Sequence, residues 1–131
     1  MTTATGEVLA KIAKRYSQFA RFEAHGVSLT YEAWALAVAE DLPARRFLAA
    51  LPREKQQPNL LFAAVRWLAP DVGDTSTFLE VLRSRGEEIS RIMMSRRVQT
   101  NEPGRCATLV PLLARLPQPL ALIEVGAAAG L

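Results

Sequence analysis

Apolar side chains recur at helical spacing from Val8 onward, and this repeat is the clearest signal in the first part of the chain. Between Val8 and Ala20 they return every three or four residues, while lysine and arginine fall largely on the other face. His25 and Gly26 then have the composition of a helix end, because glycine tolerates the left-handed conformation of a C-terminal cap. We therefore predict an amphipathic first helix that packs on the protein's own core, with a position on a membrane surface as the less favoured alternative.

Further helices follow, each introduced by a hydroxyl side chain, a proline or a polar loop. They are predicted from Ser28 or Thr30 to about residue 40, over residues 43–51, over residues 60–68, from Thr75 or Ser76 onward, and from Ser84 to about Arg97. Ser84 and Glu87 have the spacing of a capping box. Residues 60–68 are apolar nearly all round, which predicts burial. Trp34 and Trp67 are interpreted as core anchors, with a ligand-stacking role as the alternative that no other feature of the sequence favours.

The pattern changes after Thr100. Pro103 is predicted to begin another helix, with an apolar stripe that includes Cys106 and with Pro111 kinking or shortening it. After a proline-rich linker, residues 120–125 form a short apolar run that is typical of a buried parallel strand. The predicted fold is mainly α. A helical N-terminal segment, residues 1–98, precedes a connecting helix and the first β-strand and glycine loop of a truncated Rossmann-like α/β domain, residues 99–131.

The glycines that follow the predicted strand suggest a ligand-binding loop. Gly126 would let the backbone turn sharply off the strand, and Gly130 would allow close approach to a ligand. With Glu124 before it, the spacing resembles the first motif of S-adenosylmethionine-dependent methyltransferases. It is neither the dinucleotide fingerprint nor a Walker loop. A buried strand that ends in a small-residue turn remains the alternative.

Three segments together resemble one bacterial family, domain of unknown function 2332. They are residues 57–64, residues 99–106 with their distinctive Gln-Thr-Asn-Glu stretch, and residues 120–131. The resemblance implies a longer protein in which a helical N-terminal part precedes a methyltransferase-like α/β part. We accordingly expect this chain to be the front of a larger protein. It departs from the family at Ala128, where serine is usual.

Two functional hypotheses follow. In the first, the full-length protein binds S-adenosylmethionine over Glu124, Gly126, Ala128 and Gly130, while the chain alone is inactive and holds no cofactor. In the second, the chain is a non-catalytic helical interaction or structural module. Its C-terminal strand would then add to a partner's sheet or lead to self-association, since an unpaired strand edge invites pairing.

Four polar residues before the connecting helix, Gln99, Asn101, Glu102 and Arg105, allow two interpretations. Asn101 can cap that helix, and the carboxylate of Glu102 suits its positive N-terminus, so a structural role is sufficient. Alternatively, all four side chains line the pocket of the α/β domain.

Composition and charge narrow the remaining classes. Sixteen basic and thirteen acidic residues give a net charge of +3. The arginines between residues 83 and 97 alternate with acids and lack interleaved aromatic residues, so we interpret them as a solvated helix face rather than a nucleic-acid surface. One cysteine, Cys106, and one histidine, His25, predict no disulfide and no metal site. The sequence predicts neither a signal peptide nor a membrane span, and we expect a cytoplasmic protein.

Overall fold

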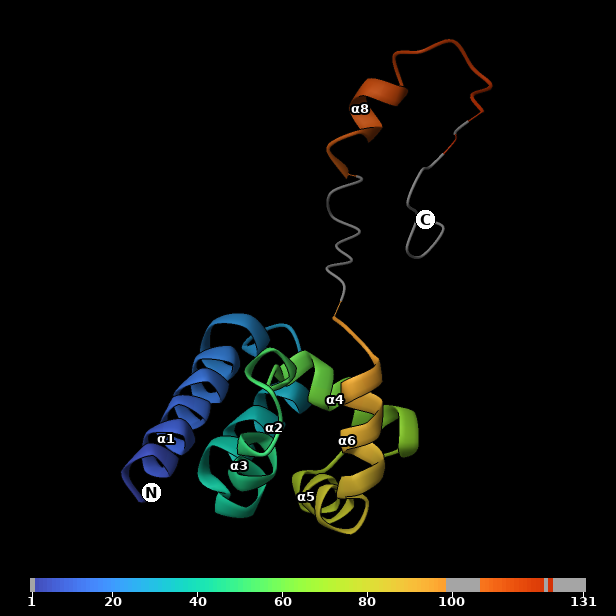
Figure 1. Ribbon diagram of the computed structural model, residues 1–131. Coiled ribbons are helices and arrows are strands. Elements are labelled where there is room, and N and C mark those ends of the chain that lie inside the picture. The colour runs from blue at the N-terminus through green and yellow to red at the C-terminus, as the bar shows by residue number, and fades with distance from the viewer. Residues whose placement is uncertain (1, 99–106, 122, 124–131) are drawn as a thin grey trace. The chain divides into compact units, whose positions relative to one another are not determined.

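The computed structural model describes residues 2–98, 107–121 and 123, with the backbone alone for residues 2–5. The chain divides into two units, residues 1–98 and residues 99–131, and each is described by itself. The described residues are mainly helical, as predicted. The first unit contains α1 (Thr2–Phe19), α2 (Leu29–Glu40), α3 (Leu42–Ala49), α4 (Pro58–Leu68), α5 (Thr75–Ser84) and α6 (Gly86–Ser95), and α8 (Val110–Leu113) belongs to the second (Figure 1).

The first helix packs through its apolar face, which confirms the amphipathic pattern. Ile12 and Tyr16 are buried, and α1 lies against α2 and α3 (Figure 1). The helix continues into a π-helical turn, Ala20–Ala24, labelled η1. Gly26 then takes a φ of 75°, which an L side chain rarely adopts. The predicted glycine cap is therefore confirmed, whereas the π-helical turn has no signal in the sequence.

Side-chain caps begin three of the helices. Ser28 accepts a hydrogen bond from the backbone N–H of Tyr31 at 3.2 Å, which settles the predicted choice between Ser28 and Thr30. Asp41 accepts one from the N–H of Ala44 at 2.8 Å and so begins α3. Asp74 does the same for α5, and hydrogen bonds from the Ser76 and Thr77 side chains and the Thr77 backbone hold the pKa of its carboxyl well below the ordinary value.

The predicted capping box at Ser84 is wrong. Ser84 is the last residue of α5, and its hydroxyl lies 3.5 Å from the carbonyl oxygen of Val81 in the preceding turn. Arg85 alone separates α5 from α6, and it caps α6 with no side-chain hydrogen bond. The two helices abut so closely that Ser84 is still helical and cannot take the extended conformation of a capping residue. The last helix of this unit also ends at Ser95 rather than near Arg97.

The core is organised around Phe62 of α4, whose side chain is fully buried. Its ring centroid lies 5.0–6.1 Å from those of five other aromatic residues on three helices: Tyr16, Phe19, Tyr31, Trp34 and Phe78. Trp34 of α2 and Phe78 of α5 also stack, with centroids 4.4 Å apart. The prediction that Trp34 anchors the core is confirmed.

The interpretation of Trp67 as a core anchor is wrong, because 70% of the residue is exposed. The expectation that the segment is buried all round fails at Ala63 as well, which is also exposed. In α4 the positions of Leu61 and Val65 face the core, and Trp67 falls on the opposite side of the helix. Counting apolar residues therefore overestimated how much of this helix is covered.

The second unit shows part of what was predicted for it. The helix α8 begins at Val110 with Pro111 in its first turn, where proline is tolerated. The predicted helix start at Pro103 lies outside the described residues. Within the predicted strand, Leu120, Ala121 and Ile123 are described, and none of them is in a strand. The other strand residues and the whole glycine loop lie outside the described residues. The Rossmann-like strand has no support from the part of this segment that can be seen.

Replacing Phe62 tests how strongly the structure depends on the aromatic core. We expect Phe62→Ala to lower the free energy of unfolding by about 3–5 kcal/mol, because it removes a ring that contacts three helices. Trp67→Ala on the same helix should change the free energy by no more than about 0.5 kcal/mol. Urea unfolding followed by circular dichroism measures both, with Phe62→Leu as a milder variant if Phe62→Ala does not fold. Equal losses for Phe62→Ala and Trp67→Ala would contradict this account.

Asp41 provides a second test, because its two oxygens have separate partners. One accepts the Ala44 N–H, and the other accepts a hydrogen bond from Arg83 at 2.6 Å. We expect Asp41→Ala to cost about 1–2 kcal/mol of stability. Asp41→Asn keeps the cap and removes only an ion pair with an exposed arginine, so it should restore most of the loss. If thermal unfolding ranks the two variants equally, the cap is not the dominant contribution.

Candidate functional site

The residues that the sequence singles out for cofactor and pocket roles all lie outside the residues that the structure describes. The cofactor candidates Glu124, Gly126, Ala128 and Gly130 all lie outside the described residues, as does Cys106. The same holds for the pocket candidates Gln99, Asn101, Glu102 and Arg105. Their predicted roles stay predictions. The candidate surfaces that the structure describes lie in the first unit.

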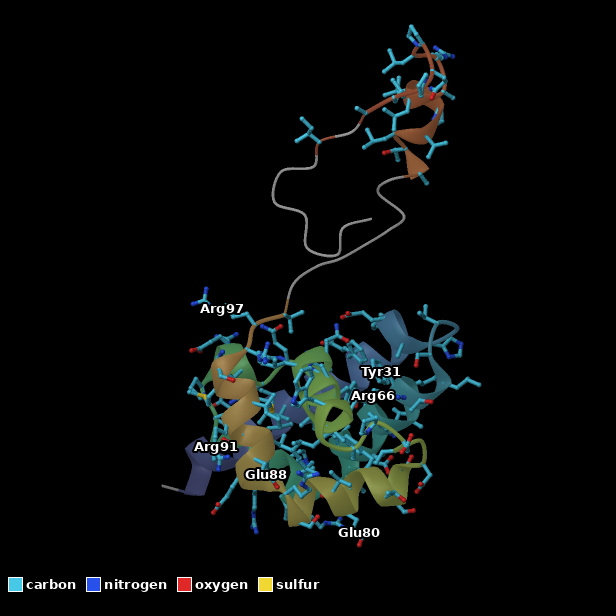
Figure 2. All side chains as sticks on the ribbon, turned by 90° about the vertical axis from the view of Figure 1, so that its right-hand side faces the viewer. Tyr31, Arg66, Glu80, Glu88, Arg91 and Arg97 are labelled. Carbon is cyan, nitrogen blue, oxygen red and sulfur yellow. The ribbon has the colours of Figure 1, made fainter. Side chains whose placement is uncertain are left out.

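The fold separates the arginines that appear as one group in the sequence. Arg83 reaches Asp41 of the N-cap of α3, with a nitrogen-to-oxygen distance of 2.6 Å. Arg85 pairs with Glu88 one turn later in α6. Arg91 follows along the same helix, where its charge further lowers the pKa of Glu88 (Figure 2). Each of these three arginines therefore has a carboxylate nearby that balances its positive charge.

Arg85 has a structural role at the junction of three helices. Its guanidinium donates two hydrogen bonds of 2.8 Å to the carboxylate of Glu88 and a third, of 3.0 Å, to the carbonyl oxygen of Leu68. The paired hydrogen bonds lower the pKa of Glu88 and raise that of Arg85. Leu68 is the last residue of α4, so Arg85 satisfies a carbonyl that the helix itself leaves open. These contacts give Arg85 a structural role and leave its guanidinium engaged within the protein.

Three other cations gather beside an exposed tryptophan, and we call this surface the basic edge: Lys55, Arg96 and Arg97 with Trp67. The Lys55 ammonium donates a hydrogen bond of 2.7 Å to the backbone carbonyl of Arg96. The Arg96 guanidinium lies over the indole of Trp67, 5.4 Å from the ring centroid. The carbonyl contact and the ring contact thus bring together residues from three separate parts of the chain.

A hollow of about 340 Å³ adjoins the basic edge. Its lining residues are Glu54, Lys55, Gln57, Leu60, Arg96, Arg97 and Val98. Figure 2 shows Arg97 just beyond the C-terminal end of α6, with its side chain on the outside of the unit. Among the described residues, no ion pair involves Lys55, Arg96 or Arg97.

Local structure fixes each part of the basic edge. Arg96 is the C-cap of α6, and its extended backbone lets the side chain leave the helix direction and reach Trp67 on α4. Lys55 belongs to the short 3-10 turn Arg53–Lys55, labelled η2. Arg15 of α1 donates hydrogen bonds of 3.4 Å to the carbonyls of Arg53 and Gln56 on either side of that lysine. These long contacts join the loop to α1 on either side of Lys55.

Sequence reasoning missed this surface for an identifiable reason. It judged the arginines near residue 96 by their neighbours in the chain, where acids alternate with them and aromatic residues are absent. The aromatic partner, Trp67, comes from another helix and was assigned to the core. A local pattern has no access to such a contact, because the packing of α4 against α6 creates it.

A larger hollow in the first unit offers less chemistry than the basic edge. It measures about 720 Å³ and lies beside Phe47 of α3 and the junction between α5 and α6. The cations that line it, Arg83 and Arg85, already pair with Asp41 and Glu88. Their charges are engaged in holding the helices, so this hollow is a weaker candidate for a binding site than the basic edge.

Two further classes of site are missing from the part of the chain that can be described. No three His, Cys, Asp or Glu side chains come together there as a set of metal ligands. No helix in that part is both long enough and apolar enough to cross a bilayer. The sole histidine, His25, instead places its Nδ1 2.9 Å from a carboxylate oxygen of Glu32.

Comparison with protein families places the chain. Residues 13–131 match the family described as "Uncharacterized protein conserved in bacteria (DUF2332)". Since the match covers most of the sequence, the chain belongs to this family, and the resemblance predicted from its motifs is confirmed. Neither the comparison with curated proteins nor the comparison with solved structures gives a match.

Proposed function

We propose that this protein is an S-adenosylmethionine-binding, methyltransferase-like protein whose cofactor loop spans residues 124–130. The observation that carries the proposal is the order of residues there: a short apolar run, then Glu124, Val125 and Gly126, then Gly130. The family match extends over this segment, which supports a structure in common with other members, although the family description names no activity. The helical first unit precedes this segment in the chain.

Each residue of the loop has a distinct physical role in this proposal. Gly126 allows the chain to leave the strand in a sharp turn, and Gly130 leaves room for the ligand where any side chain would fill it. A helix that starts after the loop directs its free N–H groups toward the ligand. Ala128 replaces the usual serine of the family and removes one hydroxyl contact. Gln99, Asn101, Glu102 and Arg105 are the accompanying candidates for the pocket wall.

Residues 1–131 by themselves should not transfer methyl groups. One strand and one loop bury too little of a cofactor to hold it and to exclude water, and small-molecule sites normally enclose most of their ligand. The test of cofactor binding therefore uses the complete gene product.

Isothermal titration of that protein with S-adenosylmethionine tests the proposal. We expect saturable binding that Gly126→Val weakens by about tenfold or more, since the added side chain blocks the turn. Ala128→Ser is the matched control in the same loop, and it should bind at least as tightly as the natural sequence. Absence of binding by a protein that circular dichroism shows to be folded would rule the cofactor out.

A second function, a non-catalytic interaction module, has one structural observation in its favour. The described part of the second unit exposes several large apolar side chains: Leu109, Val110, Leu112, Leu116 and Ile123. Ile123 in particular is 93% exposed. Apolar groups left open on a short segment favour association with another surface. In this alternative, residues 120–125 pair with a partner's sheet or with a second copy of the chain.

Light scattering after size-exclusion chromatography distinguishes this alternative. At high protein concentration we expect the 131-residue chain to elute as a dimer or larger species. Ile123→Lys should return it to a monomer, because a charge on the exposed segment disfavours edge-to-edge pairing. Val27→Lys, at a residue that is also exposed but lies in the first unit, is the control and should leave the assembly intact. A monomer at every concentration would exclude self-association.

A further inference from the structure

The indole of Trp67 is the first of three features that make the basic edge a binding surface. Trp67 takes no part in the cluster of rings around Phe62, and 70% of it is exposed. Arg96 lies over the ring and leaves much of the indole open. A tryptophan held at the end of a helix with a cation beside it can stack against a second flat aromatic ring. A purine or pyrimidine base meets that requirement.

The second feature is the charge next to the ring. Lys55, Arg96 and Arg97 together provide three positive charges, and the described residues offer them no ion pair. Lys55 uses one of its three N–H donors on the Arg96 carbonyl and keeps two. Arginine presents a flat set of donors that matches the oxygens of a phosphate. The edge is therefore suited to an anion that carries several oxygen acceptors.

The third feature is the adjoining hollow, which limits the size and chemistry of the ligand. At about 340 Å³ it falls at the lower end of small-molecule sites. Leu60 gives it an apolar wall, while Gln57 and Glu54 contribute polar groups. The Glu54 carboxylate accepts hydrogen bonds and repels phosphate, so it suits a sugar hydroxyl. The hollow thus combines groups for a sugar with cations for a phosphate.

We propose that the basic edge binds a nucleotide unit. Its base stacks on the open part of Trp67, its phosphate is bound by Arg96, Arg97 and Lys55, and its sugar faces Glu54. The unit has two sources with the same chemistry, a free nucleotide and a stretch of single-stranded nucleic acid. This site belongs entirely to residues 54–98, so it does not depend on the cofactor loop proposed above.

Tryptophan fluorescence of the 131-residue chain at low salt tests the proposal, with ATP and a single-stranded oligothymidylate as probes. Base stacking on Trp67 should quench the emission in a saturable way, whereas Trp34 is fully buried and should contribute a constant background. Binding of ATP alone identifies a nucleotide site. Tighter binding of the oligonucleotide, with a steeper loss of affinity as salt is added, identifies a single-stranded nucleic-acid site.

Matched variants locate the binding. Arg96→Gln and Arg97→Gln should each weaken binding by about tenfold, while Arg91→Gln removes the same charge from α6 away from the edge and should have little effect. Trp67→Leu, followed by isothermal titration, should weaken binding by a similar factor. Gly126→Val should leave nucleotide affinity unchanged, which separates this site from the cofactor loop.

Three results would overturn the proposal. The first is a failure of the natural sequence to bind either probe at low salt. The second is an equal loss for Arg91→Gln and Arg96→Gln, which would indicate general charge attraction rather than a site. The third is full affinity in Trp67→Leu, which would remove the stacking contact on which the choice of a nucleotide rests.

Discussion

The contacts of the Phe62 ring with its five aromatic neighbours determine the orientation of α4, and much of the first unit depends on that orientation. Successive residues of an α-helix are rotated by about 100°. Once Phe62 points into the core, Arg66, four residues later, is turned by only about 40° and stays beside the cluster. Its guanidinium accordingly lies over the ring of Tyr31, 5.6 Å from the centroid (Figure 2). It also lies over the ring of Trp34, 5.2 Å from the centroid. Trp67 is turned by about 140° and has to face outward.

This packing leaves two buried polar atoms in the core without hydrogen-bond partners in the described part of the chain, which is unfavourable. The hydroxyl of Tyr16 and the Nε1 of Trp34 are buried and have no hydrogen-bond partner among the described residues. Burial also raises the pKa of the Tyr16 hydroxyl far above its ordinary value, because a charged phenolate would lie in an apolar surrounding. An unmade buried hydrogen bond costs about 1–3 kcal/mol. Edge-to-face contacts and the burial of large rings offset that cost, so ring packing rather than polar complementarity stabilises the centre of the unit.

Features fixed by neighbouring residues could be predicted, and those fixed by distant ones could not. The Gly26 helix end follows from two or three adjacent residues and is confirmed. The cap at Ser28 is one of the two alternatives, Ser28 and Thr30, that the sequence leaves open. The Asp74 cap had a comparable local signal that was overlooked in favour of the hydroxyls after it. The capping box predicted at Ser84 is wrong because the spacing of its residues does not show whether the preceding helix has already ended. The core role predicted for Trp67 is wrong because the exposure of this side chain depends on which side of α4 packs against the core.

The same distinction explains why the candidate surface emerged from the fold alone. In the sequence, Arg83 and Arg96 belong to one run of arginines, and the local pattern gives both the same interpretation, a solvated helix face. Packing gives Arg83 a carboxylate 42 residues away, on Asp41, and gives Arg96 an indole, Trp67, from another helix. A carboxylate neutralises an arginine and holds it in place, whereas an indole leaves its charge available and positions it next to a flat apolar surface. The first contact completes the fold, and the second leaves a cation and a ring directed to a ligand.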